Sequence, residues 1–179
     1  MNIRLIWWTV IATLASKRLC GFKTKFTNLQ CDEFDKPFAT FKTCRLKALS
    51  RHQVSLNVHV QLHQVPVNNV TINAQLLRKG YDNGYKPFMY NNTADFCQFL
   101  KSSSRYMFWK IIFFKIVRPI SNINHSCPFD HDIIVKDLIL DSSMLELMPF
   151  PTNEYMVRLK VAAYNHYKAE VRVYLSIYD

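Results

Sequence analysis

Residues 54–63 read VSLNVHVQLH, which is the clearest pattern in the chain. Every even position is apolar and every odd position is polar, which is the two-residue period of a strand with one buried face. Residues 66–69 then supply a turn, and residues 70–76 repeat the alternation, so we expect these two segments to form a hairpin. The pattern therefore predicts an antiparallel sheet packed on a core.

A second hairpin is expected further along the chain. Residues 155–163 and 171–177 alternate in the same way on either side of a turn at Asn165 and His166, while residues 133–140 and 85–90 add further extended segments. Many short alternating strands separated by turns are typical of a sandwich. We therefore predict an all-β, immunoglobulin-like two-sheet antiparallel sandwich of about eight strands, with a helical insertion in the middle.

The insertion begins with a short helix that Asn92 or Thr93 would cap and that would end at Lys101. After it, residues 106–117 contain ten apolar residues of twelve, which favours a second helix, although a strand has the same composition. Such a helix is apolar on two faces. It is either an ordinary core helix, a lid over a hydrophobic cavity, or a membrane-touching face.

The two faces of this helix differ in their borders. One face is formed by Tyr106, Trp109, Ile112, Phe113 and Ile116. The other face carries Met107, Ile111 and Phe114, and basic residues border it at Lys110, Lys115 and Arg118. We expect the first face to gate or cover the interior, and the basic border to be available to a polar head group.

The first residues have the features of an export signal. Arg4 precedes an apolar run at residues 5–15, which is too short to span a bilayer and has the length of a signal-peptide core. A buried N-terminal strand is the alternative. We expect residues 1–21 to be a signal peptide and residues 22–179 to form one secreted, extracellular domain.

The chain is basic, with a formal net charge of +10. Loss of residues 1–21 would remove three basic residues and no acidic one, leaving +7. No nucleic-acid module is visible, and export argues against such a partner. An acidic membrane surface, a receptor or an acidic glycan is the expected polar partner, unless the charge serves solubility alone.

Four cysteines remain beyond the signal region: Cys31, Cys44, Cys97 and Cys127. An even number in an exported chain predicts two disulfides. Residues 23–34 and 38–49 flank a turn signal, so a hairpin would place Cys31 opposite Cys44, and elimination leaves Cys97 with Cys127.

Three Asn-x-Ser/Thr acceptors, at Asn69, Asn91 and Asn124, predict surface glycosylation.

Catalytic and metal signatures are weak. Residues 124–132 read NHSCPFDHD but lack a CxxC partner or a second histidine pair, and His59 and His63 would lie about 13 Å apart along a strand. The sequence has neither a nucleophile elbow nor an HExxH motif, and its three glycines exclude glycine-rich phosphate loops. We expect no enzyme activity, no cofactor and no metal site.

Several blocks resemble a family of small secreted insect proteins classed as a domain of unknown function. The blocks that carry the resemblance are Phe26–Cys31, Cys44–Leu46, Leu56–Val58, Tyr85–Asn91, Asp95–Leu100 and Ser121–Pro128. This family is similar in organisation to the ML-type lipid-recognition sandwich of the ganglioside-activator protein, and some insect relatives are associated with contact chemosensation. The resemblance implies two sheets that part to hold an apolar ligand.

The leading functional hypothesis is a secreted binding protein for a lipid or other small hydrophobic molecule, for which the family resemblance implies a chemosensory role. The residues expected to line the site are Leu56, Val58, Val60, Val70, Ile72, Leu76, Trp109, Phe113, Val157, Leu159, Val173 and Leu175. The alternative is an extracellular module with a filled core that binds a protein or glycan through its surface. Alternation does not separate the two, because an inward side chain looks the same whether it contacts a ligand or a neighbour.

Overall fold

The computed structural model describes residues 22–101, 107–145 and 150–178. These residues form eight strands and several short helices. The strands are β1 (Lys23–Glu33), β2 (Ala39–Ala48), β3 (Val54–Leu62), β4 (Val70–Lys79), β5 (Tyr85–Asp95), β6 (Ile133–Ile139), β7 (Asn153–Ala163) and β8 (His166–Tyr178). The helices are α2 (Phe96–Lys101), α3 (Met107–Ile112), η1 (Phe113–Val117), η2 (Arg118–Ile120) and η3 (Ser142–Met144).

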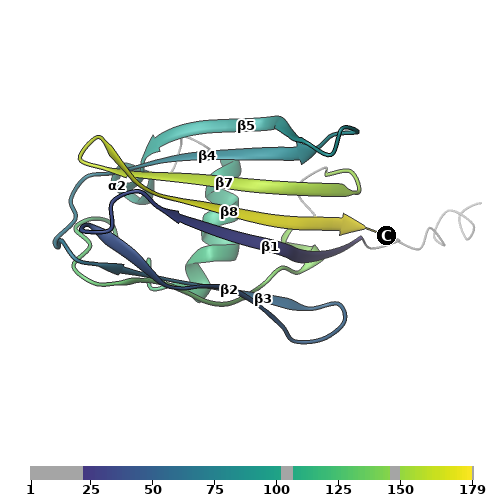
Figure 1. The fold of residues 1–179 in the computed structure, drawn as a ribbon, viewed down its shortest axis with the longest axis horizontal. Coiled ribbons are helices and arrows are strands. Elements are labelled where there is room, and N and C mark those ends of the chain that lie inside the picture. The colour runs from purple at the N-terminus through teal and green to yellow at the C-terminus, as the bar shows by residue number, and fades with distance from the viewer. Residues whose placement is uncertain (1–21, 102–106, 146–149, 179) are drawn as a thin grey trace, which may run out of the picture.

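The strands form two antiparallel sheets that face each other (Figure 1). The larger sheet has the order β1-β8-β7-β4-β5 and the smaller has the order β2-β3-β6. The prediction of an all-β, immunoglobulin-like two-sheet sandwich of about eight strands is confirmed.

The hairpin expected near residue 165 is present. β7 pairs with β8 from Asn153–Ile177 to Ala163–His166, and Tyr164 and Asn165 adopt φ values of 52° and 65° between them. Two successive positive φ values are typical of the tight turn that joins twisted antiparallel strands.

The other two expected hairpins are wrong. β1 pairs with β8 and β2 pairs with β3, so the chain crosses from one sheet to the other at residues 34–38. In the same way, β3 belongs to the small sheet and β4 to the large one. Alternating patterns with a turn between them are common to a hairpin and to an arch between sheets, because both place one face of each strand on the core.

The helical insertion also differs from expectation at its start. β5 runs on to Asp95, well beyond the segment 85–90, so neither Asn92 nor Thr93 caps a helix. The Asp95 carboxylate instead accepts a hydrogen bond of 2.9 Å from the backbone N–H of Gln98, at the beginning of α2. The polar residues before α2 belong to a strand whose outward side chains are exposed.

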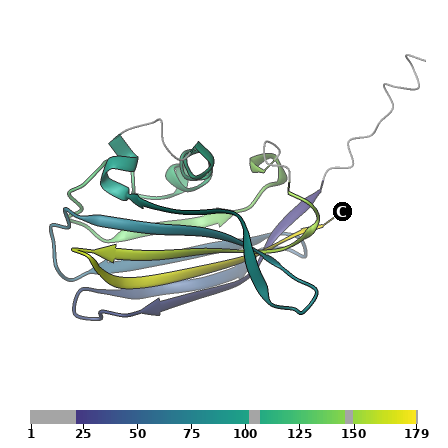
Figure 2. The same ribbon diagram turned by 90° about the horizontal axis from the view of Figure 1, so that it is seen from above.

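The insertion closes one side of the sandwich. α3 and η1 confirm the helix expected over residues 106–117, apart from Tyr106, which lies outside the described residues. Together with α2 they lie along the side where β5 and β6 are the sheet edges (Figure 2). On the opposite side the Cys31–Cys44 disulfide joins β1 to β2, with a Cα–Cα distance of 6.3 Å.

The predicted signal peptide, residues 1–21, lies outside the described residues. In the part of the chain that is described, no helix has the length and apolar character needed to cross a membrane.

Candidate ligand-binding cavity

The two sheets and the helical insertion form the walls of a cavity of about 410 Å³. This volume falls within the roughly 300–1,000 Å³ range of small-molecule sites. Inward-facing residues of both sheets form its two broad walls, as the alternation of the strands requires. The interior of the sandwich is therefore hollow.

All twelve residues expected from the sequence to line the site lie in the wall of this cavity. From β3 and β4 they are Leu56, Val58, Val60, Val70, Ile72 and Leu76; from β7 and β8 they are Val157, Leu159, Val173 and Leu175; and from the insertion they are Trp109 and Phe113. Their placement follows from strand alternation. Their contact with a ligand stays a prediction.

The third wall is the inner face of α3 and η1. Trp109, Ile112, Phe113 and Ile116 line the cavity, as the helical spacing indicates. On the outer face Met107 is 64% exposed, and Lys115 is exposed too. The helix thus covers an apolar space on one side and meets solvent on the other, which fits the lid interpretation better than that of an ordinary core helix.

Polar atoms in the wall are already engaged with protein partners. Trp109 Nε1 donates to Asn92 Oδ1 at 3.1 Å, and the Tyr155 hydroxyl donates to the Pro151 carbonyl at 2.8 Å. Burial raises the pKa of the Tyr155 phenol, while nearby Arg78 opposes this effect. Both side chains present their apolar parts to the cavity.

Lys168 is the only charged residue among the described wall residues. Its Nζ lies 2.6 Å from Asp35 Oδ2 and 4.6 Å from the centre of the Phe38 ring. The hydrogen bond from Lys168 lowers the pKa of the Asp35 carboxyl. The cavity wall therefore offers a ligand the methylene stem of this lysine, while the charge is matched by Asp35.

Sequence reasoning missed a group of aromatic wall residues that lie in irregular segments or in α2. They are Phe38, Phe96, Phe99, Phe129 and Phe150. Phe96 contacts Phe99, Phe113 and Phe129 at centroid distances of 5.9, 5.7 and 6.3 Å. The only available signal was the high phenylalanine content of residues 96–99 and 113–114, since no strand period applies there.

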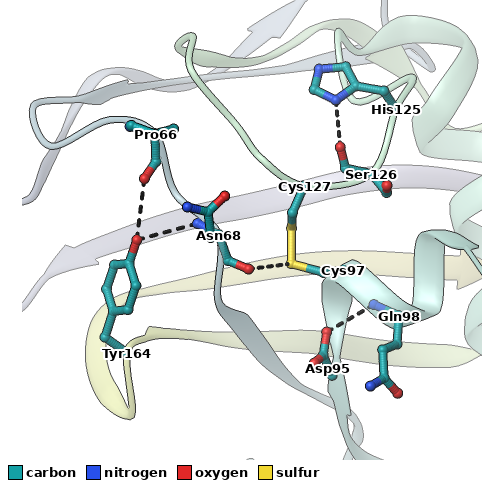
Figure 3. The surroundings of a disulfide bond; sticks show 9 residues. All are labelled: Pro66, Asn68, Asp95, Cys97, Gln98, His125, Ser126, Cys127 and Tyr164. Atoms are coloured by element: carbon teal, nitrogen blue, oxygen red, sulfur yellow. Dashed lines mark hydrogen bonds between the residues drawn. A yellow bond between two sulfur atoms is a disulfide. The ribbon is translucent and has the colours of Figure 1, made fainter.

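The Cys97–Cys127 disulfide joins α2 to the loop before β6 at one end of the cavity (Figure 3). Beside it, Cys97 Sγ lies 3.4 Å from the Asn68 carbonyl oxygen, and the Tyr164 hydroxyl donates to the Pro66 carbonyl at 3.3 Å. Val67 and Phe129 exchange two backbone hydrogen bonds of 2.8 and 2.9 Å. These links connect α2 and three loops, and they bring Val67 and Phe129 into the wall.

The basic border of the helix does not reach the cavity. Lys110 Nζ and the Arg118 guanidinium lie 5.6 and 5.2 Å from the centre of the Phe114 ring, and Lys115 is exposed. None of the three is part of the wall. Their contact with a polar head group at the mouth of the pocket stays a prediction.

The remaining predicted sites are placed as follows. Asn69, Asn91 and Asn124 are all exposed, as acceptors of a glycan must be.

His59 Nε2 lies 2.7 Å from Asp132 Oδ2, and His63 Nε2 lies 2.9 Å from Thr40 Oγ1, so the two rings have separate partners. Among the described residues no group of three His, Cys, Asp or Glu side chains could hold a metal ion.

Comparison with known structures finds a likeness to the crystal structure of a Niemann-Pick type C2 protein from the Japanese carpenter ant. The identity is 12%, the TM-score is 0.33, and the match covers 87% of this chain and 93% of that chain. At this TM-score the likeness adds nothing to the case for a ligand. No curated protein matches the chain.

The family comparison bears on the middle of the chain. Residues 72–157, which run from β4 through the insertion into β7, match the model of a family described as "Protein of unknown function (DUF1091)". The resemblance to a family of unknown function is confirmed for this segment of the chain.

Proposed function

We propose that this chain is a secreted, non-catalytic protein that binds a lipid or another small hydrophobic molecule in the cavity between its sheets. The observation that carries the proposal is the 410 Å³ space with an almost wholly apolar wall. Moving apolar surface out of water yields about 25 cal/mol per Å², so burying a few hundred Å² of ligand supplies several kcal/mol before ordering costs. The hollow interior argues against the alternative of a filled core that acts only through its surface.

The chemistry of the wall favours a neutral ligand. Lys168 is matched by Asp35, and the polar atoms of Trp109 and Tyr155 already have partners. A carboxylate buried here would lose its hydration without gaining a free cation or donor from these groups. We therefore expect a fatty-acid methyl ester to bind more tightly at neutral pH than the corresponding free acid.

Two disulfides support export, because such bonds persist mainly in oxidising compartments. A role in contact chemosensation is part of the proposal only through the family resemblance, and the cavity itself does not select it.

A fluorescent fatty probe tests the cavity directly. Val60 lines the cavity, and its neighbour Gln61 on the same strand does not. Val60→Trp fills part of the space and should weaken probe binding by at least tenfold, whereas Gln61→Trp should leave it unchanged. Val173→Phe, on the opposite sheet, provides a second filling variant in case Val60→Trp is overpacked and unstable.

The control for each variant is its thermal unfolding curve, which separates loss of the cavity from loss of the fold. If folded Val60→Trp and Val173→Phe both bind the probe as the wild type does, ligand binding between the sheets is wrong.

A further inference from the structure

The charged residues are unevenly distributed along the chain. Residues 36–81 contain seven Lys or Arg residues and no Asp or Glu. This segment includes the whole β2–β3 hairpin, whose turn projects at the lower edge of Figure 1. The hairpin is thus purely basic, whereas β1, β6, β7 and β8 each carry charges of both signs.

Three basic residues of the hairpin are exposed away from the cavity. Leu46 and Leu56 pack into the core, so strand alternation directs Arg45 and Lys47 to the outer face of the small sheet, and both are exposed. Arg51 is exposed in the turn that follows β2. Side chains two positions apart on a strand project in one direction about 7 Å apart, so Arg45 and Lys47 form a row. We call these three residues the hairpin cations.

The hairpin cations have no internal counter-charge. None of them makes an ion pair with any carboxylate in the described ranges of the chain. The outer face of the large sheet differs, because Lys160 Nζ lies 3.6 Å from Glu170 Oε2 and Arg172 is bonded to Asp32. The hairpin cations are therefore available to an anion from outside the protein.

Two acidic residues accompany the small sheet without neutralising it. Asp132 Oδ2 lies 2.7 Å from His59 Nε2 and 3.8 Å from Lys42 Nζ, so its charge is used locally. Asp137 is exposed on β6, next to Lys136 in the sequence. The small sheet, its β2–β3 turn and Asp132 together contain five Lys or Arg and two Asp residues, a formal net charge of +3.

The other outward side chains of this face distinguish between anionic partners. On β3 they are polar: Asn57, His59 and Gln61. Between residues 39 and 62 the one large apolar side chain that is strongly exposed is Leu49, in the turn. A membrane-docking surface needs an apolar face that enters the acyl boundary, and this face lacks one. Guanidinium and ammonium groups in a polar row suit the sulfate and carboxylate groups of a polysaccharide better.

We propose that the outer face of the β2–β3 hairpin binds a linear sulphated polysaccharide through Arg45, Lys47 and Arg51. A polymer that runs along β2 meets the first two cations in succession and the third at the turn. The inference shares with the proposed function only the expectation of export. None of the hairpin cations lines the cavity, so a chain held on a polysaccharide keeps its hydrophobic site accessible to ligand.

Titration with a heparin oligosaccharide at physiological ionic strength tests this site. Arg45→Glu with Lys47→Glu should weaken the affinity by roughly tenfold or more and flatten its dependence on salt, because fewer counterions are released from the polyanion. The matched control is Lys86→Glu with Lys101→Glu, which changes the net charge equally at exposed positions on β5 and α2. This control should keep most of the affinity.

Equal losses in the two double variants overturn the proposal, because net charge alone then explains the binding. So does a wild type that does not bind heparin, or one that binds phosphatidylserine vesicles more tightly than heparin. If the hairpin variant does not fold, Arg51→Glu, in the turn, replaces it, and unchanged heparin affinity in Arg51→Glu then contradicts the site. The fluorescent fatty probe should bind all these variants alike, so failure at this face and failure of the cavity are distinguishable.

Discussion

At the scale of single residues, the ion pair of Lys168 and Asp35 sets the polarity of the cavity wall. Lys168 lowers the pKa of the Asp35 carboxyl below its ordinary value of 3.8. The stabilising contact is therefore complete above about pH 4, and it is lost as the pH falls through the lower value of the folded protein.

Asp35→Asn should consequently lower the free energy of unfolding at pH 7, and its difference from the wild type should shrink towards zero in acid. Urea denaturation between pH 7 and pH 2 measures both. Asp130→Asn, at an exposed position, is the control. A pH-independent difference would mean that the contact acts through packing instead of charge.

Trp109 gives a second prediction at this scale. It is the only tryptophan in residues 22–179, it is buried, and it lines the cavity. Its emission should shift when a hydrophobic ligand enters, and Trp109→Phe should abolish the signal while leaving binding measurable by other means. An emission spectrum that no bound ligand changes would remove Trp109 from the site.

At the scale of elements, the two disulfides close loops of different length. Cys97 and Cys127 are 30 positions apart and Cys31 and Cys44 are 13 apart. Chain entropy assigns roughly 3.5 kcal/mol to the longer loop and roughly 3 kcal/mol to the shorter. We expect the Cys97→Ser, Cys127→Ser pair to be the more destabilising by denaturant titration.

The same pair should also weaken ligand binding more than Cys31→Ser with Cys44→Ser does. Its disulfide anchors α2 and the loop of Phe129, both of which contribute wall residues, whereas the other joins the sheets at β1 and β2. Identical binding by both double variants would show that the anchored end is not needed to keep the cavity open.

Strand identity was predictable at this scale, but strand pairing was not. The alternation in residues 54–62 and 155–163 correctly indicated strands and their inward faces, because one buried face imposes a period of two. The turn after β1 was also correctly located. Which sheet receives β2 depends on contacts between distant segments, and these leave no local pattern.

The Cys31–Cys44 bond shows this limit clearly. The predicted disulfide is present, although the hairpin from which it was predicted does not exist. Cys31 lies opposite Val171 in one sheet, and Cys44 lies opposite Val58 in the other. A disulfide needs only nearby β-carbons, and an arch between sheets can provide them as a hairpin does.

At the scale of the whole molecule, the sequence indicated the inner faces but not the space between them. All twelve expected residues reached the cavity, while the phenylalanines of α2 and of the loops were missed because they follow no strand period. A hollow or a filled interior depends on the sheet separation and on the position of the insertion, which only the assembled fold determines.

Glycosylation gives a prediction at this scale, since the three sequon asparagines are exposed on different segments. When the protein is produced in a eukaryotic secretion system, each of the variants Asn69→Gln, Asn91→Gln and Asn124→Gln should be lighter than the wild type by the mass of one glycan. An N-glycosidase should remove the same glycan masses from the wild type. Asn28→Gln, at an exposed position outside any sequon, is the control. A wild type whose mass the glycosidase leaves unchanged would contradict surface glycosylation.

Native mass spectrometry of the secreted protein tests the hollow sandwich most directly. We expect the folded wild type to carry or take up one hydrophobic molecule per chain, and Val60→Trp to take up less. A wild type that remains at its ligand-free mass in the presence of neutral lipids and esters would contradict the cavity as a binding site.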